Sequence, residues 1–172
     1  MMETTTSELE TFAGRLAARV VQGKPDGYEP ESLDARVQRT GLDFHLAFVP
    51  EGKLLIVARH RPAHCLLLCA ESSLTQDLDR LGILGEVKIG DPDFDARYVV
   101  KNCGQAEARA TMSAGFLATL RDLEPFLEFE MTLREYRLLK PVDASYGADR
   151  LARDLDSLAQ LVTRSRAPEE AE

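Results

Sequence analysis

The segment LDFHLAFVPEGKLLIVA, residues 42–58, carries the clearest sign of the architecture. In its first half every second position is apolar: Phe44, Leu46 and Phe48. This period of two is typical of a strand with one buried face. Pro50–Lys53 has the composition of a turn, and Leu54–Ala58 is rich in leucine, isoleucine and valine. The segment therefore predicts a β-hairpin.

Further segments along the chain have the character of strands. His64–Ala70 is apolar on both faces, as expected for a strand that is covered on both sides. Phe126–Met131 and Arg134–Leu139 alternate between apolar and polar residues and predict a second hairpin, closed by Lys140-Pro141. Two shorter strands are expected as well, at Glu86–Ile89 and Arg97–Lys101.

Segments with helical periodicity surround these strands. Ser7 and Glu10 fit a capping box at the start of an amphipathic helix over Glu8–Val21. The stretch that follows is rich in glycine and proline and predicts a connector, with a short helix near Leu33–Arg39. Other helices are predicted at Leu74–Leu81, at Gln105–Ala110, after an N-cap at Ser113, and at Ala148–Arg166.

Together these elements predict an α+β fold. Its antiparallel sheet is built from hairpins and covered by helices, with amphipathic helices at the N- and C-terminal ends. We expect residues 1–41 to form an N-terminal helix and connector, 42–166 a single α+β domain, and 167–172 a mobile acidic tail.

Composition narrows the classes of function. The chain has 172 residues, with 21 Lys and Arg against 29 Asp and Glu, and a formal net charge of −8. This acidic balance argues against a nucleic-acid partner. No secretory signal is visible, and the longest apolar runs, Leu54–Ala58 and Cys65–Ala70, are far shorter than the roughly 18–20 residues of a spanning helix. Three cysteines, an odd number, indicate a reducing, cytoplasmic compartment.

His60, His64, Cys65 and Cys69 are the densest group of metal-ligand residue types. In an extended strand, however, Cys65 and Cys69 lie roughly 13 Å apart, too far for two ligands of one ion. We therefore expect their thiols to act as small hydrophobes inside the core. A cysteine nucleophile would instead require Cys65 or Cys103 beside a histidine. A small metal-dependent or cysteine hydrolase using the His60–Cys69 region remains the alternative function.

Carboxylates occupy alternate positions in Asp91–Asp95, as at the start of a calcium loop. Such a loop needs glycine at its sixth position and glutamate at its twelfth, where this chain has Ala96 and Asn102. We expect the first and last of these carboxylates to cap nearby backbone amides. Phe94 and Tyr98 are expected to pack inward.

The twelve residues of Ile89–Val100, IGDPDFDARYVV, resemble a Gly-Asp-Pro-acid-Phe-Asp-x-Arg-aromatic-Val-Val segment of an uncharacterised group of bacterial domains. The resemblance covers about residues 42–165. It implies a short helix, a second helix, a strand pair and a C-terminal helix after this segment. Members of the group often have membrane-spanning helices before the domain. This chain has the amphipathic helix over Glu8–Val21 there, so the resemblance implies no membrane role, and it implies no activity.

The sequence contains no nucleophile elbow, phosphate loop or dinucleotide fingerprint. We therefore assign no catalytic, cofactor-binding or metal residues and predict a soluble, non-enzymatic binding or adaptor domain. Its partner would be a protein or a small ligand. The terminal helices are expected either to pack together or to form a homodimer surface. A chaperone-like partner of a secretion or signalling system is the other alternative.

Overall fold

The computed structural model describes residues 6–22, 33–70 and 87–165. The hairpin predicted at residues 42–58 is confirmed as β2 (Leu42–Val49) and β3 (Lys53–Ala58), which pair antiparallel with Phe44 opposite Ala58. Gly52 in the turn has φ +69°, a conformation that glycine adopts without strain.

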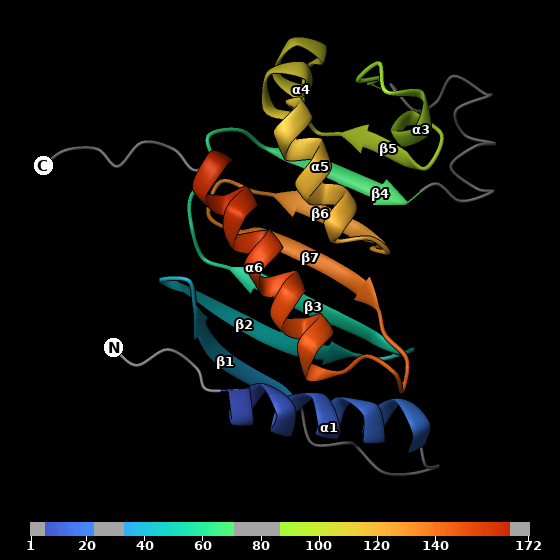
Figure 1. Cartoon of the computed structure of the whole chain (residues 1–172). Helices are drawn as coiled ribbons and strands as arrows, with labels where there is room; N and C mark the ends of the chain where they lie inside the picture. The colour runs from blue at the N-terminus through green and yellow to red at the C-terminus, as the bar shows by residue number, and fades with distance from the viewer. Residues whose placement is uncertain (1–5, 23–32, 71–86, 166–172) are drawn as a thin grey trace, which may run out of the picture.

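The hairpin belongs to an open, seven-stranded antiparallel sheet in the order β1-β2-β3-β7-β6-β4-β5 (Figure 1). The remaining strands are β1 (Asp34–Arg39), β4 (Leu66–Ala70), β5 (Tyr98–Lys101), β6 (Glu128–Met131) and β7 (Tyr136–Pro141). The second predicted hairpin is confirmed by the pairing of β6 with β7. Its second strand runs on through Lys140 and Pro141, which were expected to end it, because both residues pair with β3.

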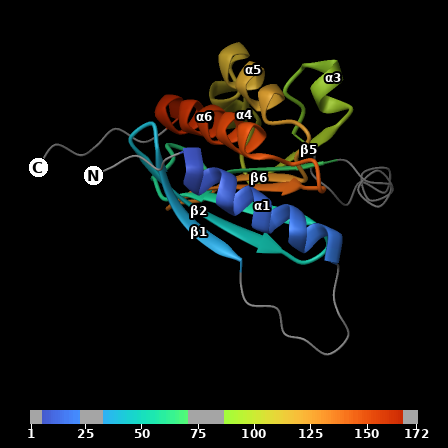
Figure 2. The same cartoon turned by 60° about the horizontal axis from the view of Figure 1, so that its bottom comes forward.

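The helices are α1 (Thr6–Gln22), α3 (Pro92–Asp95), α4 (Gln105–Thr111), α5 (Ala114–Asp122) and α6 (Ala148–Ser165). Of these, α1, α5 and α6 lie over one face of the sheet (Figures 1 and 2). The predicted α+β architecture is therefore confirmed. None of the described helices is both long and apolar enough to cross a membrane.

Of the two predicted helix N-caps, Ser113 is confirmed and Ser7 is wrong. Ser113 is the N-cap of α5, and its hydroxyl accepts a hydrogen bond from the Phe116 amide at 3.4 Å. Ser7 lies inside the first turn of α1, because that helix begins one residue earlier, and its carbonyl accepts a hydrogen bond from the Thr11 hydroxyl at 2.8 Å.

The core lies between the helices and the covered face of the sheet. Alternation along each strand directs one set of side chains toward the helices. The sheet contributes fully buried residues that include Leu46, Leu54, Ile56, Leu68, Phe129 and Leu138. The helices contribute Leu16, Leu120, Leu151, Leu155 and Leu158. Because α1 and α6 contact each other and both bury their apolar sides in this core, the terminal helices pack together within one chain.

The prediction of a short helix near Leu33–Arg39 is wrong. This segment is β1, an edge strand whose residues pair with β2, from Asp34 opposite Ala47 to Arg39 opposite Leu42. Within the strand only Val37 is fully buried. The alternation is weak because the strand lies at the edge of the sheet and its other side chains are wholly or partly exposed.

The strand expected at His64–Ala70 begins only at Leu66, and it is not buried on both faces. Leu66 and Leu68 face the core, whereas Leu67 and Cys69 are half-buried on the other face of the sheet. Of the strand expected at Glu86–Ile89, Val87 forms an isolated bridge to Val100. The predicted helix at Leu74–Leu81 and the predicted acidic tail at 167–172 lie outside the described residues.

Candidate functional site

The Asp91–Arg97 turn, whose residues resemble the bacterial domains, is held together by its own carboxylates. Asp91 caps α3 by accepting a hydrogen bond from the Phe94 amide at 3.0 Å. Asp95 accepts hydrogen bonds from the amides of Ile89 at 3.0 Å and Gly90 at 2.9 Å. Both carboxylates therefore cap local amides, as predicted. Backbone amides therefore engage Asp91 Oδ1 and both carboxylate oxygens of Asp95.

The aromatic residues of this segment pack inward, as predicted. Phe94 is fully buried, and its ring centroid lies 4.9 Å from that of Tyr98. Tyr98 in turn stacks on Phe126, with centroids 4.5 Å apart and ring planes 11° from parallel. This stack anchors the turn to the loop that follows α5.

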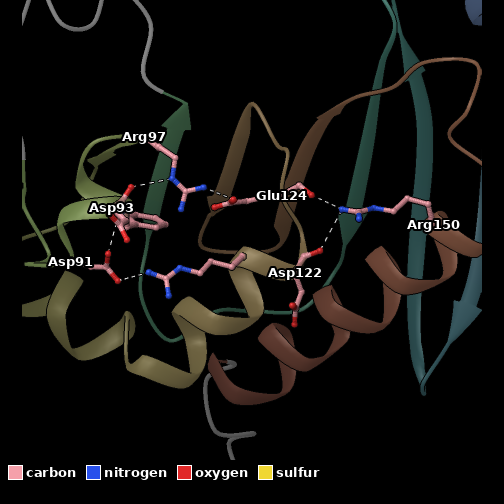
Figure 3. Close-up of polar contacts among 8 residues, drawn as sticks. Asp91, Asp93, Arg97, Asp122, Glu124 and Arg150 are labelled. Carbon is pink, nitrogen blue, oxygen red and sulfur yellow. Dashed lines mark hydrogen bonds and ion pairs between the residues drawn. The ribbon is translucent and has the colours of Figure 1, made fainter.

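Two arginines connect the turn to α5 and the loop that follows it (Figure 3). Arg121 of α5 donates to Asp91 at 2.6 Å. Arg97 donates through Nε to the Asp93 carbonyl at 3.0 Å and through Nη1 to the Glu124 carboxylate. The acidic turn is thereby neutralised in part and fixed against the helical layer.

On the other side of the same loop, Arg150 of α6 reaches the backbone (Figure 3). Its Nη2 donates to the carbonyls of Glu124 and, at 3.4 Å, of Asp122. The loop from Asp122 to Phe126 is therefore held by a guanidinium on each side. Arg97 and Arg150 both contact Glu124.

The surface beside this loop is hollowed. An open cavity of about 480 Å³, which we name the Glu124 hollow, is lined by Ala70, Arg97, Tyr98, Glu124, Pro125 and Phe126. Its aromatic wall is the stacked pair of Tyr98 and Phe126. Glu124 Oε1 is removed from solvent and accepts no hydrogen bond within the described part of the chain. The hollow thus combines apolar surface with an acceptor that lacks a donor.

The surroundings of Tyr98 in this hollow change the pKa of its phenol. Burial raises the pKa of its phenol to about 12, and the negative charge of Glu124 acts in the same direction. The nearby Arg97 guanidinium, 5.6 Å from the ring centroid, opposes the increase. The phenol is therefore neutral at physiological pH and is suited to hydrogen bonding rather than to base catalysis.

A second polar group lies beneath the helices. The Lys140 ammonium on β7 pairs with Asp154 on α6 at 2.9 Å, and both side chains are almost fully excluded from solvent. The Tyr146 hydroxyl donates to the same carboxylate. Burial lowers the pKa of Lys140, with the attraction of Asp154 opposing that effect, and burial raises the pKa of Tyr146. Asp154 Oδ1 accepts no hydrogen bond from the described residues, but Oδ2 pairs with both Lys140 and Tyr146 deep in the core, and we interpret the cluster as structural.

The structure does not bring the His60–Cys69 residues together. His60 lies in the segment after β3, His64 is exposed, and Cys65 precedes β4, whereas Cys69 lies within that strand. Across the described ranges, no three His, Cys, Asp or Glu side chains form a group that could hold a metal ion. The described part of this region therefore lacks the metal site that a metal-dependent hydrolase would need.

The thiols of Cys69 and Cys103 also lack the activation of a nucleophile. Burial raises the pKa of Cys69, and the charges of Glu128 and Glu130 add to that increase against an opposing Lys101. Burial and Glu107 raise the pKa of Cys103. A raised pKa keeps a thiol protonated and unreactive at neutral pH. Cys69 is half-buried, so it is less enclosed than the interior position that we expected.

Sequence reasoning missed Glu124, Lys140 and Asp154. Asp154 could have been recognised, because it lies three residues after Leu151 and four before Leu158, on the apolar side of its helix. Lys140 alternates with Tyr136 and Leu138, which share its buried face. No comparable pattern marks Glu124, whose contacts come from Arg97 and Arg150, far away in the sequence.

An open antiparallel sheet with helices over one face places the chain among α+β proteins. No family model matches it, and no curated protein matches it. Among solved structures, it is similar to the crystal structure of the mycobacterial trehalose monomycolate transport factor A, TtfA. The TM-score is 0.55 and the sequence identity 11%, over 94% of this chain and 98% of that chain. At this identity the likeness shows a shared fold.

Proposed function

We propose that this chain is a non-enzymatic adaptor domain that binds a protein partner at the Glu124 hollow. The carrying observation is Glu124 Oε1, a buried acceptor that has no donor within the described residues. Leaving such an atom unsatisfied costs about 1–3 kcal/mol. A partner that places a hydrogen-bond donor there recovers this free energy on binding, and this gain favours binding at the hollow.

The surroundings of the hollow define the chemistry of the partner. Tyr98 and Phe126 offer a flat apolar wall, and Arg97 is already engaged by Glu124. Among the described residues, only Arg97 and Arg121 pair with carboxylates of the turn and loop, which favours a cationic donor; the carboxylates there belong to Asp91, Asp93, Asp95, Asp122 and Glu124. A lysine or arginine side chain carried beside an apolar residue satisfies both the acceptor and the wall.

Fold likeness supports an adaptor role in transport. The solved structure to which this chain is similar is described as a transport factor, so we propose a partner within a transport system. The apolar sides of α1 and α6 are already buried within one chain, and we therefore assign the partner surface to the hollow rather than to these helices. Three free thiols suit the cytoplasmic compartment that we propose.

The test begins with a photo-crosslinking residue at Ala96, an exposed position next to Arg97, in the full chain expressed in its source organism. The crosslinked protein is identified and purified, and its binding is measured by calorimetry. We expect Glu124→Gln to weaken binding about tenfold or more, because the variant keeps an amide oxygen as acceptor but loses the negative charge that favours a cationic donor.

Glu128→Gln is the matched control, because Glu128 is an exposed glutamate on β6 and loses the same charge. We expect it to bind as the unmodified chain does. Equal binding by both variants would place the partner elsewhere and overturn the proposal. So would the failure of every crosslinked protein to bind the chain after purification.

A further inference from the structure

A second hollow, separate from the Glu124 hollow, lies against the C-terminal half of α6. Arg39 at the end of β1 and Thr40 in the turn that follows supply one wall, and α6 supplies the other from Asp156 to Arg164. The cavity has a volume of about 620 Å³. This volume falls within the range of small-molecule sites, about 300–1,000 Å³.

The charges that line this α6 hollow do not cancel. Arg39 pairs with Asp156 through two parallel bonds, from Nε to Oδ1 at 2.6 Å and from Nη2 to Oδ2 at 2.8 Å. That pair neutralises the carboxylate of the hollow. Arg164 has no carboxylate partner in the described part of the chain, so the lining carries one net positive charge. Such a surplus stands out in a protein whose net charge is −8.

The Arg164 guanidinium is held in place by neutral groups. Its Nη1 donates to the Gly115 carbonyl at 2.8 Å and to the Thr119 hydroxyl at 3.1 Å. A Cβ at position 115 would lie 3.2 Å from that nitrogen, so glycine permits the close approach to α5. Both bonds use one nitrogen, which leaves the N–H groups of Nε and Nη2 without an acceptor among the described residues.

The other polar groups of the hollow narrow the choice of ligand. The hydroxyls of Thr40 and Thr163 already donate to backbone carbonyls, at 2.7 and 2.9 Å. Gln160 is exposed one turn before Arg164, on the same side of α6, and its amide is a further donor. The donors available for an anion are therefore the remaining edge of Arg164 and the Gln160 amide.

We propose that the α6 hollow binds a small organic monocarboxylate through Arg164. Its carboxylate accepts two parallel hydrogen bonds from Nε and Nη2, the geometry in which a guanidinium holds a carboxylate best. One net positive charge in the lining matches a monoanion. A doubly charged phosphate would keep one negative charge uncompensated, because the lining carries only one net positive charge.

The test is an NMR titration of the full chain with acetate, with inorganic phosphate as a parallel arm at constant ionic strength. The reporters are the side-chain amide of Gln160 and the backbone amide of Thr163. We expect saturable shifts with acetate in the millimolar range and weaker binding of phosphate. Tighter binding of phosphate than of acetate overturns the assignment to monocarboxylates.

Three variants test the role of Arg164. We expect Arg164→Gln to weaken acetate binding by about tenfold, because it removes the charged donor pair. Arg153→Gln removes the same charge from an exposed position on the same helix and should bind as the unmodified chain does. Gly115→Val should weaken binding without changing any charge, because the new side chain displaces the guanidinium. Equal effects of the two arginine variants overturn the proposal.

The acidic residues at 169, 170 and 172 follow α6 in the sequence and are potential competitors for the same guanidinium. The titration is therefore repeated with all three changed to glutamine. Absence of saturable acetate binding in both the unmodified chain and this variant overturns the proposal. Tighter binding in the variant supports it.

Discussion

Lys140 on β7 and Asp154 on α6 form an ion pair with Nζ and Oδ2 2.9 Å apart and only 1% and 0% of their side chains exposed. The ammonium also donates to the Leu123 carbonyl at the end of α5. Arg150 Nε lies 3.2 Å from the other carboxylate oxygen without a hydrogen bond to it. One buried carboxylate thus joins the sheet, the C-terminal helix and the loop that carries Glu124.

Removing one charge of this pair should destabilise the fold strongly. Asp154→Asn leaves the Lys140 ammonium buried without its counter-ion, and breaking a buried pair in this way costs about 3–5 kcal/mol. We expect the free energy of unfolding, measured with urea, to fall by that amount.

The matched control removes both charges. The double variant Lys140→Met with Asp154→Leu leaves no buried charge, and we expect it to be more stable than Asp154→Asn alone. If the double variant loses as much as the sum of its two single variants, the two side chains do not interact and our account of the cluster is wrong.

Local pattern explains why much of the fold could be predicted and one strand could not. Residues 42–58 alternate because one face of a central hairpin is buried, so their period alone indicates the strands. β1 has the sequence DARVQR, in which only Val37 is fully buried. It is a strand because it pairs with β2, a tertiary contact that its own residues do not encode.

The site was harder to predict than the fold for the same physical reason. The capping roles of Asp91 and Asp95 involve neighbours within six residues and were predicted correctly. The contact between Arg97 and Glu124 spans 27 residues. Whether a charged side chain is exposed or paired depends on such distant partners, and a single sequence does not specify them.

Tyr98 should give the stability of the protein a dependence on alkaline pH. Its pKa is raised from 10.0 to about 12 in the folded state, so between these values the folded chain binds a proton that the unfolded chain has lost. The stabilisation is fully present below pH 10 and is lost as the pH rises toward 12. We expect the free energy of unfolding to fall over that interval.

Tyr98→Phe isolates this contribution, since it removes the titrating hydroxyl and keeps the ring that stacks on Phe126. The decline between pH 10 and 12 should be shallower in the variant, and the step near pH 12 in the tyrosinate absorbance titration should shrink. An identical pH dependence in both proteins would show that the phenol titrates normally.

Asp91 should act as a cap and not as a calcium ligand. Asp91→Ala removes the acceptor of the Phe94 amide, and the loss of such a cap costs about 0.5–2 kcal/mol. Asp91→Asn keeps an acceptor and loses only the charge that pairs with Arg121, worth about 1 kcal/mol or less at a partly exposed site. We expect alanine to be the more destabilising change in urea unfolding.

Calcium should leave the unfolding midpoint of the unmodified chain unchanged, and a calcium-dependent increase abolished by Asp91→Ala would contradict this.

Replacing Gly52 by alanine should destabilise the fold more than the same change at Gly41, although the two turn glycines have similar backbone conformations. Gly41 and Gly52 have φ of +75° and +69°, a region in which a side chain costs about 1–2 kcal/mol, so alanine is unfavourable at both. They differ in their surroundings: a Cβ at 41 meets nothing within 4 Å, whereas a Cβ at 52 would lie 3.1 Å from the Val142 carbonyl. That approach is held by the hydrogen bond from the Val142 amide to the Gly52 carbonyl at 2.8 Å, which ties the hairpin turn to the residue after β7. The clash adds to the conformational cost, so Gly52→Ala should lower the free energy of unfolding more than Gly41→Ala does. Equal losses in urea unfolding would mean that the turn relaxes away from Val142 without cost.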